Sequence, residues 1–169
     1  MHELAITVIG PDRTGIVADV AEALAGVGAN LTDSTMTRLR GHFAMTLICT
    51  GPSAAEAEAA LTAVTGGGLL ATVRRVEPEA AGALNGDPYL VSVHGADRLG
   101  IVSAVTRVVA AAGGNITDLT TRLTGPLYLL VAEVDLPSDA AEQLAEQLAV
   151  AGAELGVEVT LRRASAELL

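Results

Sequence analysis

The 169-residue sequence predicts an α+β fold of two ferredoxin-like units, each with the element order β-α-β-β-α-β. The first observation behind this prediction is a repeat, because GPDRTGIV at residues 10–17 returns as GADRLGIV at residues 95–102, an offset of 95 − 10 = 85 residues. The second is Asn-x-Thr-Asp, at residues 30–33 and 115–118, with the same offset. The third observation is that each glycine motif follows a stretch of alternating apolar residues, typical of a strand, and precedes the pattern of an amphipathic helix. We infer a tandem duplication.

Local patterns place the elements of the first unit in order. Apolar alternation predicts strands, apolar residues three and four apart predict helices, and glycines end the helices. The Thr-rich stretch 30–38 favours a strand with one wet face, and residues 40–42 form a hairpin turn. Ser53 and Glu56 make a capping-box pattern. The expected elements are a strand at 3–9, a helix from 16 to near 27, strands at 30–38 and 43–50, a helix from 54 ending before 66, and a strand at 69–75.

The second unit repeats this order and follows a linker. Pro78, Gly82 and Gly86 are typical of a linker, so we expect domains at residues 1–77 and 87–169, joined by residues 78–86. Each unit folds most simply as an antiparallel four-stranded sheet with both helices on one face. The expected elements are a strand from Tyr89, a helix from Ile101, strands at 115–123 and 127–134, a longer helix capped by Ser138, and a strand at 157–161.

Composition limits the classes of function. The formal net charge is −10, and the sequence contains no lysine. A protein that neutralises phosphates needs a basic face, so we expect no direct nucleic-acid partner and no anionic membrane surface. Only 2% of the residues are aromatic although 50% are hydrophobic, so the cores must consist of aliphatic side chains. Units of this size gain stability by packing against another unit or subunit.

The single cysteine and the first residues of the sequence give an expectation for the cellular compartment. Cys49 lies in an apolar run, which predicts a core residue in a buried strand. One cysteine allows no internal disulfide and suits a reducing cytoplasm. Residues 1–3 lack the features of a signal peptide, and Arg107 interrupts the best candidate for a membrane-spanning run. We therefore expect a cytoplasmic protein.

The two glycine turns are the candidate binding sites. A tight strand-to-helix turn points free helix N–H groups and the positive end of the helix dipole at any ligand above it. A small carboxylate is the ligand that such a turn favours. The alternative is a plain turn, in which Asp12 caps the helix and Arg13 is solvated. Because Asp-Arg-x-Gly occurs twice, we favour a functional role.

Other motifs are rejected. The Walker phosphate loop fails because Ile16 and Val17 stand where Lys and Ser or Thr are required, and the dinucleotide fingerprint fails because Asp12 and Asp97 replace its middle glycine. The histidines lie on separate elements, so we expect no metal site and no cofactor. A small enzyme using Asp12 or Asp97 as acid or base is a remaining alternative, but we do not expect an enzyme. The three histidines are His2, His42 and His94, of which His94 could contact a ligand or simply be half-buried.

For the polar strand and the two arginine pairs, the sequence allows more than one kind of contact. Thr32, Ser34, Thr35 and Thr37 are too polar for a core, so this sheet face must meet water, a ligand or a partner. The pairs 74–75 and 162–163 end the last strand of each unit. They could pair with acids on a neighbouring unit or be solvated, the commoner fate of such side chains.

These patterns resemble the ACT family of small-molecule-binding regulatory domains. The likeness rests on the element order, the two glycine motifs and the asparagine that opens each second strand, and it covers all but the linker. A two-unit chain without a catalytic domain is similar to the glycine-cleavage transcriptional repressor group. In the family, amino acids commonly sit between two ACT units, against the first-turn backbone and this asparagine. The resemblance implies one site at Asp12, Arg13, Thr14, Gly15, Ile16 and Asn30 and another at Asp97, Arg98, Leu99, Gly100, Ile101 and Asn115.

The resemblance also implies a role. We expect a regulatory amino-acid sensor that acts through protein–protein contacts, with a protein partner such as a transcription regulator, in control of amino-acid (glycine) metabolism or its transcription. The polar sheet faces and edge strands predict a homodimer. Leu99 in place of Thr14 predicts unequal sites, and asparagine is also common where a chain leaves a helix. The alternative function is a ligand-independent interaction module.

Overall fold

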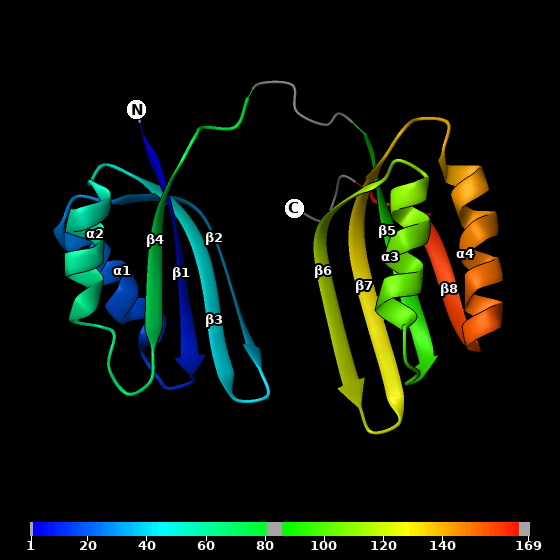
Figure 1. Ribbon diagram of the computed structural model, residues 1–169, viewed down its shortest axis with the longest axis horizontal. Coiled ribbons are helices and arrows are strands. Elements are labelled where there is room, and N and C mark those ends of the chain that lie inside the picture. Colours follow the sequence, from blue (N-terminus) through cyan, green and yellow to red (C-terminus); the bar gives the residue numbers. More distant parts are fainter. Residues whose placement is uncertain (1, 81–85, 166–169) are drawn as a thin grey trace. The chain divides into compact units, whose positions relative to one another are not determined.

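The computed structural model describes residues 2–80 and 86–165, which belong to two compact units, Met1–Ala80 and Ala81–Leu169. Figure 1 shows that each unit is a sheet with two helices on one face. The expected linker at 78–86 includes residues 81–85, which lie outside the described residues. Within the described ranges, no helix is long and apolar enough to cross a membrane.

Unit 1 has the predicted β-α-β-β-α-β order. All strand pairs are antiparallel and the sheet order is β2-β3-β1-β4, so the two edges are β2 and β4. This is the ferredoxin-like arrangement. The elements are β1 (Glu3–Pro11), α1 (Ile16–Gly26), β2 (Asn30–Leu39), β3 (His42–Thr50), α2 (Ala54–Thr62) and β4 (Leu70–Val76).

Unit 2 repeats the same topology. Its sheet order is β6-β7-β5-β8, again antiparallel throughout. The predicted α+β class and the tandem arrangement are therefore confirmed. The elements are β5 (Asp87–Ala96), α3 (Ile101–Ala111), β6 (Asn115–Thr124), β7 (Leu127–Leu136), α4 (Ala141–Leu155) and β8 (Val157–Arg163).

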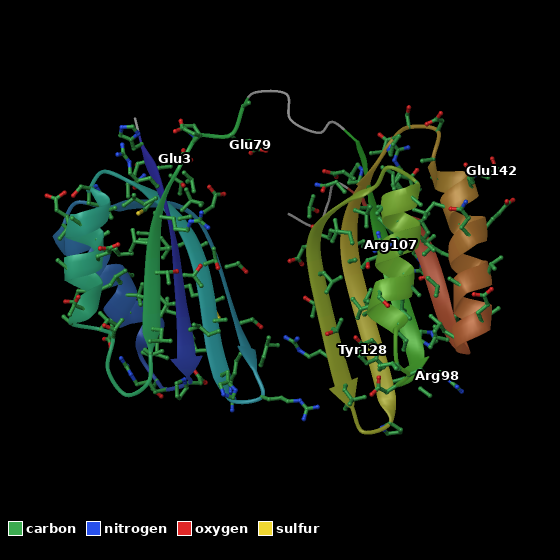
Figure 2. The ribbon with its side chains drawn as sticks, in the orientation of Figure 1. Glu3, Glu79, Arg98, Arg107, Tyr128 and Glu142 are labelled. Carbon is green, nitrogen blue, oxygen red and sulfur yellow. The ribbon has the colours of Figure 1, made fainter. Side chains whose placement is uncertain are left out.

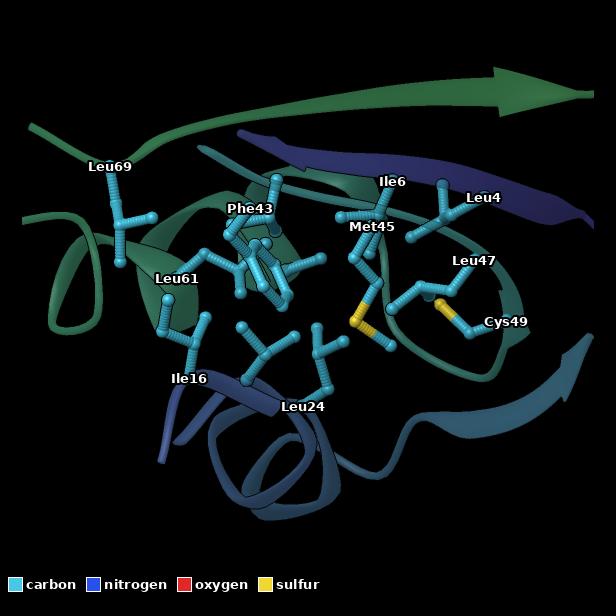
Figure 3. Close-up of a cluster of buried hydrophobic side chains, with 13 residues drawn as sticks. Leu4, Ile6, Ile16, Leu24, Phe43, Met45, Leu47, Cys49, Leu61 and Leu69 are labelled. Atoms are coloured by element: carbon cyan, nitrogen blue, oxygen red, sulfur yellow. The ribbon is translucent and has the colours of Figure 1, made fainter. Parts of the chain in front are cut away.

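The core of each unit lies between its sheet and its helices. In β1, Leu4, Ile6 and Val8 are buried while their neighbours are not, because side chains alternate between the two faces of a strand. Figure 3 shows such side chains meeting those of α1 and α2, with Phe43 among them. Cys49 is 0% exposed and belongs to this cluster, as predicted.

The polar strand β2 lies at a sheet edge. All of its side chains are at least partly exposed, so its threonines lie on the water-exposed edge as well as on the face away from the helices. On that face, Thr7 and Thr46 lie across the β1–β3 pair with their hydroxyl oxygens 3.4 Å apart. The polarity of residues 32–37 therefore reflects position in the sheet.

The two units differ in how their second helix begins. Ser53 caps α2 as predicted: its Oγ accepts a hydrogen bond from the Glu56 N–H, and a Glu56 oxygen accepts one from the Ser53 N–H at 2.8 Å. The prediction that Ser138 caps α4 is wrong. Ser138 lies in a turn, and α4 begins at Ala141 without a side-chain cap. Residue 141 stands where Glu56 would recur (56 + 85 = 141), so the capping box has lost its glutamate.

Two glycine turns as the candidate functional site

Each turn between the first strand and the first helix depends on two glycines. A Cβ at Gly10 would lie 2.6 Å from the Gly68 carbonyl oxygen, so the end of β1 packs backbone to backbone against the α2–β4 loop. Gly15 is the N-cap of α1 with φ of 87°, a left-handed conformation that other residues adopt at a cost. In unit 2, Gly100 is the N-cap of α3 with φ of 90°, and a Cβ at Gly95 would lie 2.9 Å from Cγ1 of Val157 at the start of β8. The tight turns inferred from the sequence are therefore present.

The helix that leaves each turn starts without a side-chain cap. Neither Gly15 nor Gly100 can accept a hydrogen bond through a side chain, and among the described residues no side-chain hydrogen bond caps these ends. The alternative in which Asp12 caps α1 is thus wrong. Ile16 and Ile101 are each 2% exposed, with their side chains in the cores. They can therefore offer a ligand only their backbone N–H groups.

The charged side chains of the first turn are neutralised within unit 1. The Asp12 carboxylate lies 3.2 Å from the Arg38 Nε. Arg13 donates a hydrogen bond of 2.8 Å to Asp19 and one of 3.1 Å to the Thr14 carbonyl oxygen. Asp19 lies in the first turn of α1, so Arg13 folds back onto its own helix. The first turn offers a ligand chiefly its backbone.

The second turn lacks both neutralising partners. The position of Arg38 holds Leu123 (38 + 85 = 123), and that of Asp19 holds Ala104 (19 + 85 = 104). Among the described residues, neither Asp97 nor Arg98 has an ion-pair partner. Asp97 and Arg98 therefore stand at this turn without ion pairs among the described residues, and the Arg98 guanidinium lies beside Gly156 at the C-terminal end of α4.

A hollow of about 520 Å³ opens at the second turn. Tyr128, from β7, faces the start of α3 across it, and Figure 2 labels Arg98 and Tyr128 in this part of unit 2. The hollow thus combines both charge signs with the unpaired N–H groups at the start of α3. Its lining residues are Asp97, Arg98, Leu99, Gly100, Ile101, Val102, Ser103 and Tyr128.

The asparagines lie far from the turn of their own unit. Asn30 is opposite Thr50, which is opposite Glu3 at the start of β1, whereas the first turn follows Pro11 at its other end. Eight steps of about 3.3 Å along a strand separate these ends by about 26 Å. The same register places Asn115 away from the second turn. Neither implied site is therefore assembled within one unit.

Each asparagine instead lines a hollow at its own end. Asn30 borders one of about 720 Å³ with His2, Ser53 and Arg75. Asn115 borders a groove of about 450 Å³ along α3 and β6. Ser103 lines both this groove and the hollow at the second turn, so the two are neighbours along α3.

Some residues of these sites escaped the sequence analysis. Ser103 and Tyr128 belong to no repeated motif: Ser103 lies at the start of α3, and Tyr128 reaches the second turn because it pairs with Gly95 between β7 and β5. The missing partner of Arg98 could have been found, since aligning the copies places Ala104 opposite Asp19. His94 contacts Glu158 at 3.5 Å, both largely exposed, and lines none of the three hollows.

Comparison with known proteins gives a family for both units. A model of the ACT domain matches residues 2–65 and 87–162. The protein MK1213 of Methanopyrus kandleri, of the UPF0237 group, is 39% identical over 75 residues, which are 43% of this chain and 83% of that protein. MJ1558 of Methanocaldococcus jannaschii, from the same group, is 35% identical over 75 residues, with the same coverage.

Solved structures agree with this fold over nearly the whole chain. A protein of unknown function from Galdieria sulphuraria superposes with a TM-score of 0.83 at 29% identity, covering 98% of this chain and 100% of that one. A candidate glycine cleavage system transcriptional repressor superposes with a TM-score of 0.70 at 21% identity, covering 95% and 96%. The second likeness shows a shared fold.

Proposed function

The chain belongs to the ACT domain family, and from this premise we propose that it is a regulatory protein that binds a free amino acid at its second turn and acts through protein contacts. The observation that carries the proposal is the pair of unpaired charges, Asp97 and Arg98, beside the open start of α3. A free amino acid carries one ammonium and one carboxylate on the same carbon atom, so its charges complement this pair.

The chemistry of the second turn assigns a role to each group. The Arg98 guanidinium and the first N–H groups of α3 donate hydrogen bonds to the ligand carboxylate. The Asp97 carboxylate accepts hydrogen bonds from the ligand ammonium. Tyr128 and Ser103 stand where the ligand side chain would be, so they set the size that fits.

A second copy of the chain would complete the site. The second turn and Asn115 lie at opposite ends of the same edge, formed by α3 and β6. If two β6 edges met antiparallel about a two-fold axis, the turn of each copy would face Asn115 of the other. β6 is an edge strand with free backbone groups, which suits such pairing. We propose a homodimer of this kind, in which the ligand joins two copies.

The two turns bind unequally in this proposal. Arg13 and Asp12 are already paired within unit 1, so a ligand at the first turn would compete with Asp19 and Arg38. Thr14 at the first turn and the fully exposed Leu99 at the second add a further difference. The second turn is the principal site, and the first is a weaker one.

We further propose that the protein controls amino-acid metabolism or the transcription of genes for it. The fold shared with a candidate glycine cleavage repressor puts glycine, and the similar serine, first among the ligands to test. The partner we propose is a protein such as a transcription regulator, because a chain with net charge −10 and no lysine offers no surface for DNA.

A thermal-shift screen of the full chain against the twenty amino acids tests the function. At least one small amino acid should raise the melting temperature in a dose-dependent way, since a ligand that binds only the folded state stabilises it. Arg98→Gln and Asn115→Ala should each reduce that shift without lowering the ligand-free melting temperature. A flat response to all twenty would contradict the proposal.

A ligand-independent interaction module is the second candidate, favoured by the outer face of the unit 2 sheet. Leu127, Leu129 and Val131 project from alternate positions of β7 on this face and are 42%, 38% and 45% exposed. The equivalent positions of unit 1 hold His42, Ala44 and Thr46. A row of three exposed apolar side chains along one strand favours a protein partner. In this case, partner binding would not change when amino acids are added.

A further inference from the structure

Unit 1 carries an unpaired arginine in the hollow at the end opposite its glycine turn. Arg75 lies opposite Leu4 in the β4–β1 pair, and both line the hollow of about 720 Å³. Within the described part of the chain, no carboxylate lies at ion-pair distance from Arg75. A guanidinium that faces a hollow without a counter-charge is a natural place for an anion.

Unit 2 shows which group belongs beside this arginine. Arg163 lies opposite Tyr89 in the β8–β5 pair, as Arg75 lies opposite Leu4 (4 + 85 = 89). It donates a 3.1 Å hydrogen bond to Asp87. Asp87 stands where unit 1 has His2 (2 + 85 = 87). Unit 2 therefore carries its own carboxylate at this point, and unit 1 lacks it.

We propose that the hollow of unit 1 binds a small monocarboxylate, whose carboxylate contacts Arg75 as Asp87 contacts Arg163 in unit 2. Arginine holds a carboxylate with two parallel hydrogen bonds, which fixes its orientation. Asn30, on the same lining, offers amide donors to the second oxygen.

The rest of the lining defines the ligand further. Leu4, Pro52 and Ala54 give the hollow an apolar side, which suits a short alkyl chain on the carboxylate. The Ser53 hydroxyl already donates to Glu56, so it adds no donor. The volume lies within the range of about 300–1,000 Å³ that is typical of small-molecule sites. A short aliphatic carboxylate therefore fits better than inorganic phosphate.

The site is independent of amino-acid binding at the second turn, and propionate separates the two because it has no ammonium group. The experiment is a titration of the ¹⁵N-labelled full chain with sodium propionate at constant ionic strength, with sodium chloride as the reference. We expect saturable shifts of the Asn30 side-chain amide, the Arg75 Nε–H and the backbone amides near Ser53.

Two variants and one control make the result specific. Arg75→Gln removes the guanidinium, and His2→Asp supplies the internal carboxylate that unit 2 has. Each should weaken propionate binding about tenfold or more, the loss expected for one charged hydrogen-bonded contact. Arg163→Gln changes the equivalent arginine of unit 2 and should leave the affinity unchanged. Shifts that stay linear in propionate, or equal affinity in all four proteins, would overturn the proposal.

Discussion

The Arg13 guanidinium lies 2.8 Å from the Asp19 carboxylate, and this contact distinguishes the two copies of an otherwise repeated turn. In unit 2 the position equivalent to Asp19 holds Ala104, and the guanidinium of the equivalent arginine, Arg98, lies beside Gly156. Unit 2 in turn pairs Arg163 with Asp87, whereas the equivalent Arg75 has no acidic partner among the described residues. Of these two pairs of equivalent arginines, each unit thus leaves one without an ion-pair partner among the described residues, at opposite ends of the repeated fold.

Ala104→Asp should convert the second turn into a copy of the first. The new carboxylate would attract Arg98 as Asp19 attracts Arg13, so we expect the amino acid found in the screen to bind about tenfold more weakly. Isothermal titration calorimetry measures the affinity. Asp19→Ala is the control, because it frees Arg13 and should leave binding at the second turn unchanged. Unaltered affinity in Ala104→Asp would remove Arg98 from the ligand site.

Gly15→Ala should destabilise the protein, because an alanine at φ of 87° strains the backbone by about 1–2 kcal/mol. Gly26→Ala, at the other end of α1, is the matched control, since a Cβ there meets no atom within 4 Å. It should be neutral or stabilise by up to about 1 kcal/mol. Urea unfolding followed by circular dichroism gives both values. An equal effect of the two substitutions would show that the left-handed N-cap is not needed.

Ser53→Ala should lower the stability by about 1 kcal/mol, because it removes the side-chain cap of α2. Ser138→Ala is the matched control at the repeated position, where no cap forms, and should have little effect. Urea midpoints of the two variants give the comparison. A larger loss for Ser138→Ala would mean that α4 is capped in solution.

The same cap predicts a dependence on pH. The hydrogen bond from the Ser53 backbone, and then that from its side chain, lower the pKa of Glu56 below its ordinary 4.5. The cap therefore contributes its stability fully above pH 4.5 and loses it as the pH falls through the folded-state pKa. Glu56→Gln should flatten this part of the stability profile, which urea unfolding at a series of pH values measures. An unchanged profile would show that another carboxylate causes the dependence.

Cys49 should react with a thiol reagent only when unit 1 opens. It is 0% exposed, and burial raises the pKa of its thiol above the ordinary 9.0. Both effects reduce the thiolate that attacks the reagent. Because Cys49 is the only cysteine, labelling with a chromogenic disulfide at pH 8 follows this residue alone. The rate should rise steeply with urea, and fast labelling without denaturant would contradict the burial of β3.

The raised pKa of the Cys49 thiol also makes the free energy of unfolding depend on pH. Folding keeps the proton on Cys49, so this contribution is full below pH 9.0 and is lost as the pH rises through the folded-state pKa. Cys49→Ala should therefore weaken the alkaline loss of stability. Urea midpoints between pH 8 and pH 10, compared with the unsubstituted chain, provide the measurement.

Much of the fold could be predicted from particular residues. Leu4, Ile6 and Val8 alternate in sequence and are buried in the structure, because a strand with one covered face imposes that period. Gly10 and Gly15 marked a tight turn that the backbone confirms. The prediction for Ser138 failed because the residue three positions later is alanine, a detail that the serine alone does not show.

The candidate site was harder to predict, because its members lie on separate elements. The resemblance to the ACT family grouped Asn30 with Asp12, yet the register of β1, β2 and β3 puts them at opposite ends of unit 1. Tyr128 carried no signal at all, since it joins the second turn through the pairing of β7 with β5.

By itself, the sequence determined the duplication, the order of strands and helices and the residues of the two cores, since periodicity along the chain decides which side chains can be covered together. Only the tertiary structure decided which arginines are neutralised and which face an open hollow. Ion pairing depends on the distance between atoms of different elements, and a repeat of 85 residues preserves the motifs without preserving their partners.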